Sequence, residues 1–519
     1  MNIKSSRRGF IRGMAGISLV GATGCRSLCC GGQKIKLAVV GVMGKGFSDW
    51  TPMLKGGFVE IVAFCDCDYT QRDKAQMKLV EEGIDFDMYR VPFYTDYRKL
   101  LDDCGILGVE AMTISTPDHV HAPVAIQAMK MGIHVYVQKP LVRTLWELDY
   151  FNRTAKENNV IVQMGNQGSS LDSMRRCVEI LQDGLLGDVK EVHVWTDRPV
   201  WPQGKVLGDY IKSRGDKGDP IPAGLNWNAF LATAKERAYL GAFPENLGPF
   251  HNDWKIGPNI YHMFNWRSSP DFGAGAFGDM SCHTMNLPFR GLELADVTDA
   301  ECVMSEGGCD NNYPVKSVVK LVYRERVAKF GANAGKKLPA VTLYWYDGDE
   351  KPKADLMPKY AAKNGGKVPD TGCFILGTKG SVLMQDDYGD KCAIELKGDK
   401  DYVSVLEHPA CAAVPHRIPH CEGPKSVLGS KSVEMKGFGE GHYYEFCRAI
   451  RGEGPVYADT HSRCFSDIEY CIPQMEGIIV GVTAQRVGGK LKWDTKSQKF
   501  DVAAANDLIK PYIREGWEF

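Results

Sequence analysis

The sequence has almost no net charge, and it contains neither internal repeats nor low-complexity tracts. Its 63 Lys and Arg residues balance 64 Asp and Glu residues, so the net charge is −1. A chain without a basic field is not expected to bind nucleic acid, and the lack of an acidic run argues against a solvating tail. The composition is that of a folded protein: 519 residues, 44% of them hydrophobic, suffice for two or three domains.

The sequence also lacks the motifs of several enzyme classes. We find no Ser/His/Asp arrangement, no phosphate-binding Lys-Ser loop and no common zinc spacing. The nearest approach to a metal cluster is formed by Cys411, Cys421, His408, His416 and His420, and its Pro-rich surroundings favour an irregular loop. The 17 cysteines are scattered without the framework of a small disulfide-linked domain, and we expect no metal site.

Residues 1–33 predict an export signal and linker rather than part of the fold. Ser6-Arg7-Arg8-Gly9-Phe10 precedes an apolar stretch from Met14 to Gly24 that is too short and too glycine-rich to span a bilayer. This is the layout of a twin-arginine signal, so we expect a periplasmic or otherwise exported protein. Ala22-Thr23-Gly24-Cys25 resembles a weak lipobox. Two alternatives follow: a lipoprotein anchored through Cys25, or cleavage without lipid.

The residues after the linker predict the start of a nucleotide-binding fold. Lys34–Val40 is rich in β-branched residues, as a buried parallel strand is, and it leads into Gly41-Val42-Met43-Gly44-Lys45-Gly46. The dinucleotide fingerprint uses its glycines for a tight turn, close approach to the pyrophosphate and packing of helix on strand. Gly41 and Gly46 hold the first and third places. Met43 stands at the second, with Gly44 beside it.

A second strand, Val59–Phe64, ends close to Asp66. A carboxylate at this place accepts hydrogen bonds from the adenosine ribose, and its charge would repel a 2′-phosphate. The sequence therefore favours NAD over NADP, with Asp68 beginning the following loop or helix.

Two further strands and a helix continue the pattern. The strands are Val109–Ser115 and His134–Val137, and the helix between them is Ala122–Gly132. Strands that alternate with helices predict a doubly wound parallel sheet, whose ligands bind beyond the carboxyl ends of the strands. The residues that follow these ends are therefore candidates for the site: Thr116, Pro117, His121, Gln138 and Lys139.

Several motifs together resemble the glucose–fructose oxidoreductase / inositol dehydrogenase / MocA family. Beyond the glycine turn, they are Thr116-Pro117 followed by His121, Gln138-Lys139-Pro140, Gln163-Met164-Gly165-Asn166-Gln167, Arg198-Pro199-Val200-Trp201-Pro202-Gln203-Gly204 and Gly278-Asp279-Met280-Ser281-Cys282-His283. Most members carry Glu-Lys-Pro where this chain has Gln138-Lys139-Pro140, and the glutamine form resembles an exported branch. The resemblance extends to Gly489–Asp494 and the terminal Gly516–Phe519.

The resemblance implies an α/β protein with two domains after the signal. A Rossmann NAD-binding domain would occupy residues 34–165. A substrate-binding α/β domain with an open, mainly antiparallel sheet would occupy residues 166–519, with its C-terminal segment packing back. Substrate would lie between that sheet and the nicotinamide. Family members are often dimers or tetramers, so we expect a homo-oligomer.

The resemblance also implies the catalytic residues. Lys139 matches the family lysine that contacts the reacting hydroxyl, and Asp279 and His283 match an acid–histidine pair near the substrate. Asp279 and His283 are four residues apart, so in a helix they would share one face, and the carboxylate would fix the imidazole tautomer. Lys139, as a cation, would stabilise alkoxide character. With Gln138 in place of the family's glutamate, the negative charge beside Lys139 is lost. This leaves the ionisation state of Lys139 open.

The expected binding residues form two groups. For the cofactor we expect contacts from Gly41, Met43, Gly44, Gly46, Asp66, Thr116, Pro117, His121, Gln138, Lys139, Asn166 and Gln167. For a carbohydrate substrate we expect contacts from Arg198, Trp201, Gln203 and Arg267, with His251, Asn252, Trp254 and Trp266 as further candidates.

The second half of the chain predicts strands at Val189–Trp195, Val297–Val303, Val315–Tyr323, Ala340–Tyr346 and Gly372–Leu383. Residues 205–264 are rich in Pro, Gly and Trp and predict an insertion over the cleft. Residues 390–437 predict a largely irregular stretch. Two helices, 442–451 and 466–486, are expected to pack back on the sheet.

Three functions are compatible with these features. The first is an exported, NAD-dependent oxidoreductase that acts on a secondary hydroxyl of a sugar or glycoside. Because an exported enzyme meets no sizeable pool of free NAD, its cofactor would be retained and restored within each cycle. The second is a redox-assisted glycoside hydrolase or lyase with transient oxidation at C3, in the manner of glycoside hydrolase family 109, whose own histidine motifs do not appear here. The third is a non-catalytic binding protein, which Gln138 mildly favours.

Overall fold

The computed structural model describes residues 33–244, 259–421 and 441–519. The predicted export signal and Cys25 lie outside the described residues, as do His251, Asn252 and Trp254. The fold below is that of the compact unit Lys34–Phe519.

The first half of this unit is a six-stranded parallel sheet with the strand order β3-β2-β1-β4-β5-β6. This is the doubly wound order in which ligands bind at the crevice between the two halves of the sheet, and it confirms the predicted fold class. The short strands are buried on both faces because helices cover both. Their bounds are β1 Ile35–Val40, β2 Val59–Cys65, β3 Phe93–Tyr94, β4 Ala111–Ile114, β5 His134–Val137 and β6 Val162–Met164.

The helices between these strands begin at sequence signals that can be identified. α5 starts with a capping box, in which Thr144 and Glu147 satisfy each other's backbone N–H groups. α4 starts at Asp118, four residues before the predicted helix, directly after Pro117. The bounds are α1 Lys45–Lys55, α2 Thr70–Glu81, α3 Tyr97–Leu107, α4 Asp118–Lys130 and α5 Leu145–Asn158.

The second half is built on a ten-stranded, mainly antiparallel sheet with the order β16-β15-β14-β13-β7-β12-β9-β8-β17-β18. Only β7 and β12 pair in parallel. The strands are β7 Val189–Trp195, β8 Val297–Glu306, β9 Lys316–Tyr323, β12 Val341–Asp347, β13 Gly372–Gly377, β14 Gly380–Met384, β15 Cys392–Leu396, β16 Val403–Ser404, β17 Gly489–Asp494 and β18 Lys499–Phe500. A separate small hairpin joins β10 Arg326–Val327 to β11 Lys337–Leu338.

One expectation about this half was wrong. Residues 372–383 are not one strand but the hairpin β13–β14, because Gly377 and Gly380 bracket a turn whose N–H groups bond to the chain before β7. In its described part, the stretch after Asp390 is largely irregular, as predicted. It contains β15, β16 and the short helix α12 Pro409–Ala412, while residues 422–437 lie outside the described part.

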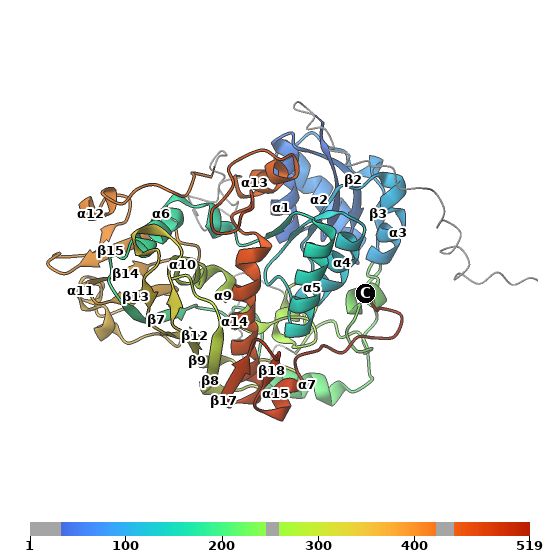
Figure 1. Cartoon of the computed structure of the whole chain (residues 1–519). Coiled ribbons are helices and arrows are strands. Elements are labelled where there is room, and N and C mark those ends of the chain that lie inside the picture. Colours follow the sequence, from blue (N-terminus) through green and yellow to red (C-terminus); the bar gives the residue numbers. More distant parts are fainter. Residues whose placement is uncertain (1–32, 245–258, 422–440) are drawn as a thin grey trace, which may run out of the picture. The chain divides into compact units, whose positions relative to one another are not determined.

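Helix α14, Ile468–Val487, runs between the two sheets and contacts strands of both (Figure 1). Leu321 of β9 and Ile478 of α14 belong to the same hydrophobic cluster as Val40 of β1 and Val124 of α4. The two halves therefore share a core. The remaining α-helices are α6 Asp172–Gln182, α7 Lys205–Arg214, α8 Trp227–Leu231, α9 Gly275–Thr284, α10 Asn286–Gly291, α11 Pro358–Lys363, α13 Gly441–Ile450 and α15 Ala503–Asn506.

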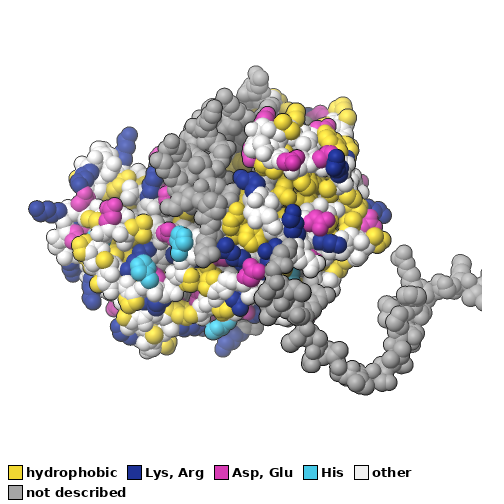
Figure 2. Space-filling view, turned by 90° about the horizontal axis from the view of Figure 1, so that it is seen from above, with side chains coloured by type: hydrophobic (Ala, Val, Ile, Leu, Met, Phe, Trp, Pro, Cys, Tyr) yellow, Lys and Arg dark blue, Asp and Glu magenta, His cyan; other side chains and the backbone are white. Residues whose placement is uncertain are grey.

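The surface carries mixed charge. On the face shown in Figure 2, basic and acidic side chains are interspersed. Among the described residues, no helix has both the length and the apolar character needed to cross a bilayer.

Candidate active site

One cavity of about 850 Å³ joins the carboxyl ends of β1, β2, β4 and β5 to helix α9 and to residues 262–267 of the second half. This volume is typical of sites that take a cofactor or drug-sized ligand. Fourteen of the predicted site residues line it: Gly41, Met43, Gly44, Asp66, Thr116, Pro117, Gln138, Lys139, Gln167, Arg198, Trp201, Arg267, Asp279 and His283.

Four predicted residues are not among those lining the cavity, and each is used in packing. His121 places its two ring nitrogens 2.7 Å from the Pro140 carbonyl and 3.0 Å from the Thr116 carbonyl, so it joins two of the strand-end segments. Gln203 is bonded to Trp201 and to the Pro314 carbonyl. Gly46 supports the glycine turn, and Asn166, after β6, is fully buried.

The glycine turn has the shape that a dinucleotide requires. A Cβ on Gly46 would lie 2.0 Å from the Gly41 carbonyl oxygen, so only glycine lets α1 pack this closely on the turn. Gly44 has φ +61° and no atom within 4 Å of a Cβ position, which leaves its backbone open to the cavity that it lines. The residues present therefore fit an NAD pyrophosphate despite Met43 at the second place.

Asp66 lies at the end of β2, as the fingerprint requires. Its two carboxylate oxygens accept the N–H groups of Val42 (3.0 Å) and Asp68 (3.1 Å), so it ties the glycine turn to the β2–α2 turn. Burial raises the pKa of Asp66 above its ordinary value, and the two hydrogen bonds lower it by less than burial raises it. The side chain borders the cavity where the adenosine ribose of a dinucleotide lies.

Gln138 is held by a buried carboxylate from another helix. Its Nε2 donates to both oxygens of Asp49 of α1, at 2.9 and 3.1 Å. Asp49 also accepts from Lys45 Nζ (2.6 Å) and from Ser115 Oγ (2.8 Å). The negative charge that a glutamate at position 138 would bring is therefore supplied next to Gln138 by Asp49.

Lys139 and Asp279 form the centre of the half of the cavity that α9 lines. Lys139 Nζ donates to Asp279 Oδ1 and to the Asp279 carbonyl, both at 2.9 Å, and Arg267 Nε lies 3.2 Å from the same carboxylate oxygen. Burial alone would raise the pKa of Asp279, but the charges of Lys139 and Arg267 outweigh it and hold the pKa well below its usual value. Asp279 is therefore an anion shared by two cations.

His283 shares a face of α9 with Asp279, as predicted, but the two do not form the expected hydrogen-bonded pair. Asp279 is taken by Lys139 and Arg267, and His283 Nδ1 is buried with no hydrogen-bond partner among the described residues. The ring instead packs edge-on against Tyr388, with the centroids 4.7 Å apart. Burial, and then the charge of Lys139, lower the pKa of His283 well below its ordinary value, so the imidazole is neutral.

Aromatic rings and arginines form the outer wall. The Arg267 guanidinium lies 4.1 Å from the ring centre of Phe264 and 4.2 Å from that of Trp266. Arg198 is paired with Asp197 and Asp387. Flat rings and fixed guanidinium groups of this kind suit a ligand with both apolar faces and hydroxyl groups.

Asp118, which the sequence analysis did not single out, adds a second carboxylate to this half of the cavity. One of its oxygens accepts the Ala274 N–H at 3.0 Å, just before α9. Burial raises the pKa of Asp118 to about 7, with the nearby Arg267 opposing it and Asp279 adding to it. Asp279 and Asp118 thus share a cavity with pKa values shifted in opposite directions, which is how a site separates an anion from an acid–base group.

Replacing Asp118 with asparagine is expected to stabilise the protein as the pH rises. The folded-state pKa of Asp118 is raised to about 7, so its contribution to stability is lost as the pH climbs from the unfolded value toward neutrality. Asparagine keeps an oxygen for the Ala274 N–H and does not ionise. The variant's free energy of unfolding minus that of the wild type should increase by about 2 kcal/mol between about pH 5 and about pH 8. Denaturant unfolding at each pH measures this difference. A difference in unfolding free energy that does not change with pH would contradict the raised pKa of Asp118.

The other residues that sequence reasoning missed are Asp49, His262 and Tyr388. Asp49 stands inside an ordinary helix, and Tyr388 follows β14 in a loop without a motif. His262 lies in the predicted insertion. Only Asp118 carried a signal, since it stands in the Thr116–His121 motif at a strand end.

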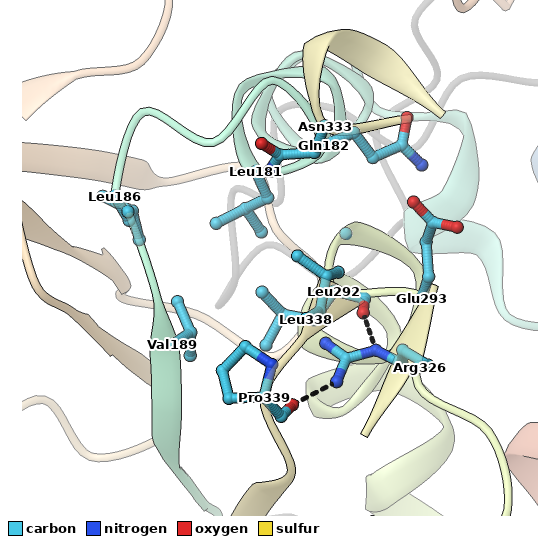
Figure 3. A pocket seen from close by; sticks show the side chains of 12 residues that line it. Leu181, Gln182, Leu186, Val189, Leu292, Glu293, Arg326, Asn333, Leu338 and Pro339 are labelled. Atoms are coloured by element: carbon cyan, nitrogen blue, oxygen red, sulfur yellow. Dashed lines mark hydrogen bonds between the residues drawn. The ribbon is translucent and has the colours of Figure 1, made fainter. Parts of the chain in front are cut away.

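Features elsewhere in the described part of the chain offer no competing site. A second hollow beside Arg326 has room for about one water molecule, at about 20 Å³, and Arg326 there donates to the Leu292 and Pro339 carbonyls (Figure 3). The described His, Cys, Asp and Glu residues form no metal-binding group. All fourteen described cysteines are thiols.

Fold and cavity together define a dinucleotide-binding fold whose crevice opens onto a second, mainly antiparallel sheet domain. Residues 35–166 match the family described as an oxidoreductase family with an NAD-binding Rossmann fold, which is the glucose–fructose oxidoreductase / inositol dehydrogenase / MocA family. The match covers the nucleotide-binding half of this chain, agrees with the resemblance that the sequence motifs carry, and is to a domain that binds NAD.

Similar proteins extend this assignment. A glycosyl hydrolase family 109 protein of Akkermansia muciniphila is 28% identical over 163 residues, which are 30% of this chain and 32% of that protein. A 2,7-anhydro-N-acetylneuraminate hydratase of Mediterraneibacter gnavus is 29% identical over 110 residues, which are 21% of this chain and 29% of that protein. The matches thus span about a third of these relatives.

A solved structure shows that the whole fold is shared. An inositol dehydrogenase homologue from Azotobacter vinelandii, in complex with NADH and myo-inositol, aligns over 89% of this chain and 98% of its own, with a TM-score of 0.54 and 16% sequence identity.

Proposed function

We propose that this protein is an NAD-dependent oxidoreductase that acts on a secondary hydroxyl of a sugar or glycoside. One observation carries the proposal: the glycine turn and Asp66 line the same cavity as Lys139, Asp279 and His283. A cofactor on the turn and a carbohydrate against α9 would meet inside a single cavity. The neighbouring structure with NADH and myo-inositol supports a polyol or sugar as the ligand class.

The side chains suit this reaction. Bound NAD supplies the acceptor for hydride, and the protein must take the hydroxyl proton and stabilise the alkoxide. Lys139, fixed by two 2.9 Å bonds to Asp279, holds a positive charge for the oxygen that loses its proton. His283 lines the cavity and its imidazole is neutral, so it is placed to accept the proton.

The second candidate is a redox-assisted glycosidase or lyase. The family 109 relative and the presence of Asp118 favour it, because elimination at a glycosidic bond needs one proton-transfer group more than oxidation does. The two candidates are separated by product analysis after the protein meets a panel of sugars and glycosides. Keto-sugar alone supports the oxidoreductase, and released aglycone supports the glycosidase. Neither product from a protein that holds NAD would support a binding protein instead.

We also propose that the protein is exported with NAD already bound. The export signal would be the twin-arginine pair Arg7 and Arg8. Replacing both arginines with lysine is expected to leave the protein in the cytoplasm, because the export machinery reads the arginine pair. The check is cell fractionation followed by immunoblotting. Unchanged export of the lysine variant would refute the signal. Mass spectrometry of the exported N-terminus decides whether Cys25 carries lipid.

We also propose that the protein forms a homo-oligomer. Light scattering of the purified protein measures its oligomeric state.

A further inference from the structure

The turn between β2 and α2, in the nucleotide-binding half, is hydrogen-bonded to two short segments from the second half of the chain. We call residues 224–226 and 262–263 the clasp. The Tyr69 N–H donates to the Gly224 carbonyl at 2.9 Å, and the Asn226 N–H donates to the Cys67 carbonyl at 2.7 Å. The backbone of the turn is thus joined to the clasp in both directions.

Side chains make a second connection. His262 Nε2 lies 3.0 Å from Asp68 Oδ2, with only 15% and 10% of the two side chains exposed. Burial alone would raise the pKa of Asp68, but hydrogen bonds from His262, Thr70 and Gln71 hold the pKa well below its usual range. Asp68 is therefore an anion, and its bond to His262 is charge-assisted.

The clasp borders the part of the cavity that takes adenosine. The β2–α2 turn directly follows Asp66, the residue placed to meet the adenosine ribose. Cys67 of the turn and Gln71 of α2 line the cavity, and so do His262 and Met263 of the clasp. The bonds between turn and clasp therefore join two parts of the cavity wall beside Asp66.

The clasp is fixed to the body of the protein. Leu225 belongs to a hydrophobic cluster with Trp227, Phe230 and Phe272, against which Cys67 packs. The neighbouring residues 228–233 are held by Arg514 near the C-terminus, which donates to the Asn228 and Ala232 carbonyls at 2.9 and 3.0 Å. Moving the clasp away from the turn would disturb this whole assembly.

We propose that the clasp retains the dinucleotide, with His262 as a positioning residue that keeps the adenosine end enclosed by holding Asp68. Release of NAD then requires the bond between His262 and Asp68 to open, and the cofactor stays bound from one turnover to the next. The inference rests on the proposed NAD-dependent function and adds how the cofactor is kept.

The test is the rate at which bound NADH leaves. The purified full chain is loaded with NADH and mixed with excess NAD, and the loss of protein-bound NADH fluorescence gives the release rate. His262→Leu, which keeps apolar bulk against Phe230 but has no N–H, is expected to release NADH at least about tenfold faster, or about 1.4 kcal/mol. His262→Gln, whose amide can donate to Asp68, should release it nearly as slowly as the wild type.

A matched control removes a similar pair elsewhere. His420 is paired with Asp172 and does not line the cavity, so His420→Leu should leave release unchanged. If His262→Leu does not fold by circular dichroism, His262→Ala takes its place. Release from the variant within about twofold of the wild type would overturn the clasp while the NAD-dependent function stands. A wild type that binds no NADH would overturn both.

Discussion

Replacing Lys139 with methionine is expected to lower oxidation of the carbohydrate hydroxyl by about 1,000-fold while NAD still binds. Methionine keeps the length of the side chain but removes the charge that faces the reacting oxygen. Asp279 keeps Arg267 as its partner at 3.2 Å, so the buried carboxylate is not left alone and the fold should persist. The measurement is the single-turnover appearance of reduced nicotinamide, with the sugar or glycoside that the product panel identifies.

Lys359→Met is the matched control for this change. Lys359 is also a partly buried lysine paired with a carboxylate, Glu395, but it does not line the cavity. Its replacement should leave turnover unchanged. Turnover of the Lys139 variant within tenfold of the wild type, with the control normal, would remove Lys139 from the chemistry.

Replacing Gly46 with alanine is expected to weaken NAD binding by about 100-fold, equal to about 3 kcal/mol. The new methyl group would lie 2.0 Å from the Gly41 carbonyl oxygen, so α1 has to move away from the turn that holds the pyrophosphate. The check is the NAD content of the purified variant and its affinity for added NADH by fluorescence titration.

Gly105→Ala provides the comparison within a helix. Gly105 lies in α3, and no atom stands within 4 Å of its Cβ position, so alanine there is tolerated and should stabilise the helix slightly. Normal NAD binding by the Gly46 variant would show that the turn does not hold the cofactor as described.

The nucleotide-binding half could be predicted because its signals are local. β1, β2, β4 and β5 are short apolar runs followed closely by a glycine, an acid or a proline, and these following residues lie where the ligand binds. β3 and β6, with two and three residues, are too short to show such a pattern and were not predicted. The hairpin at Gly377–Gly380 was missed although Gly377-Thr378-Lys379-Gly380 separates two short apolar runs and is itself a turn signal.

The pairings inside the site could not be predicted because they join distant residues. Asp279 is four residues from His283 but bonds to Lys139, which is 140 residues away in sequence. Asp49 reaches Gln138 across 89 residues and supplies the charge that the motif lacks. The sequence thus identified residues that line the cavity, while burial and charge decided which of them pair.

The most direct test of the account follows a hydrogen from substrate to cofactor. The NAD-loaded protein is mixed with a sugar or glycoside deuterated at its ring carbons and then denatured, and the released nicotinamide is examined by mass spectrometry. The account predicts deuterium on the dinucleotide released from the wild type and none from the Lys139→Met variant. A dinucleotide left unlabelled when the wild-type reaction is stopped within its first turnover, or no dinucleotide released at all, would contradict it.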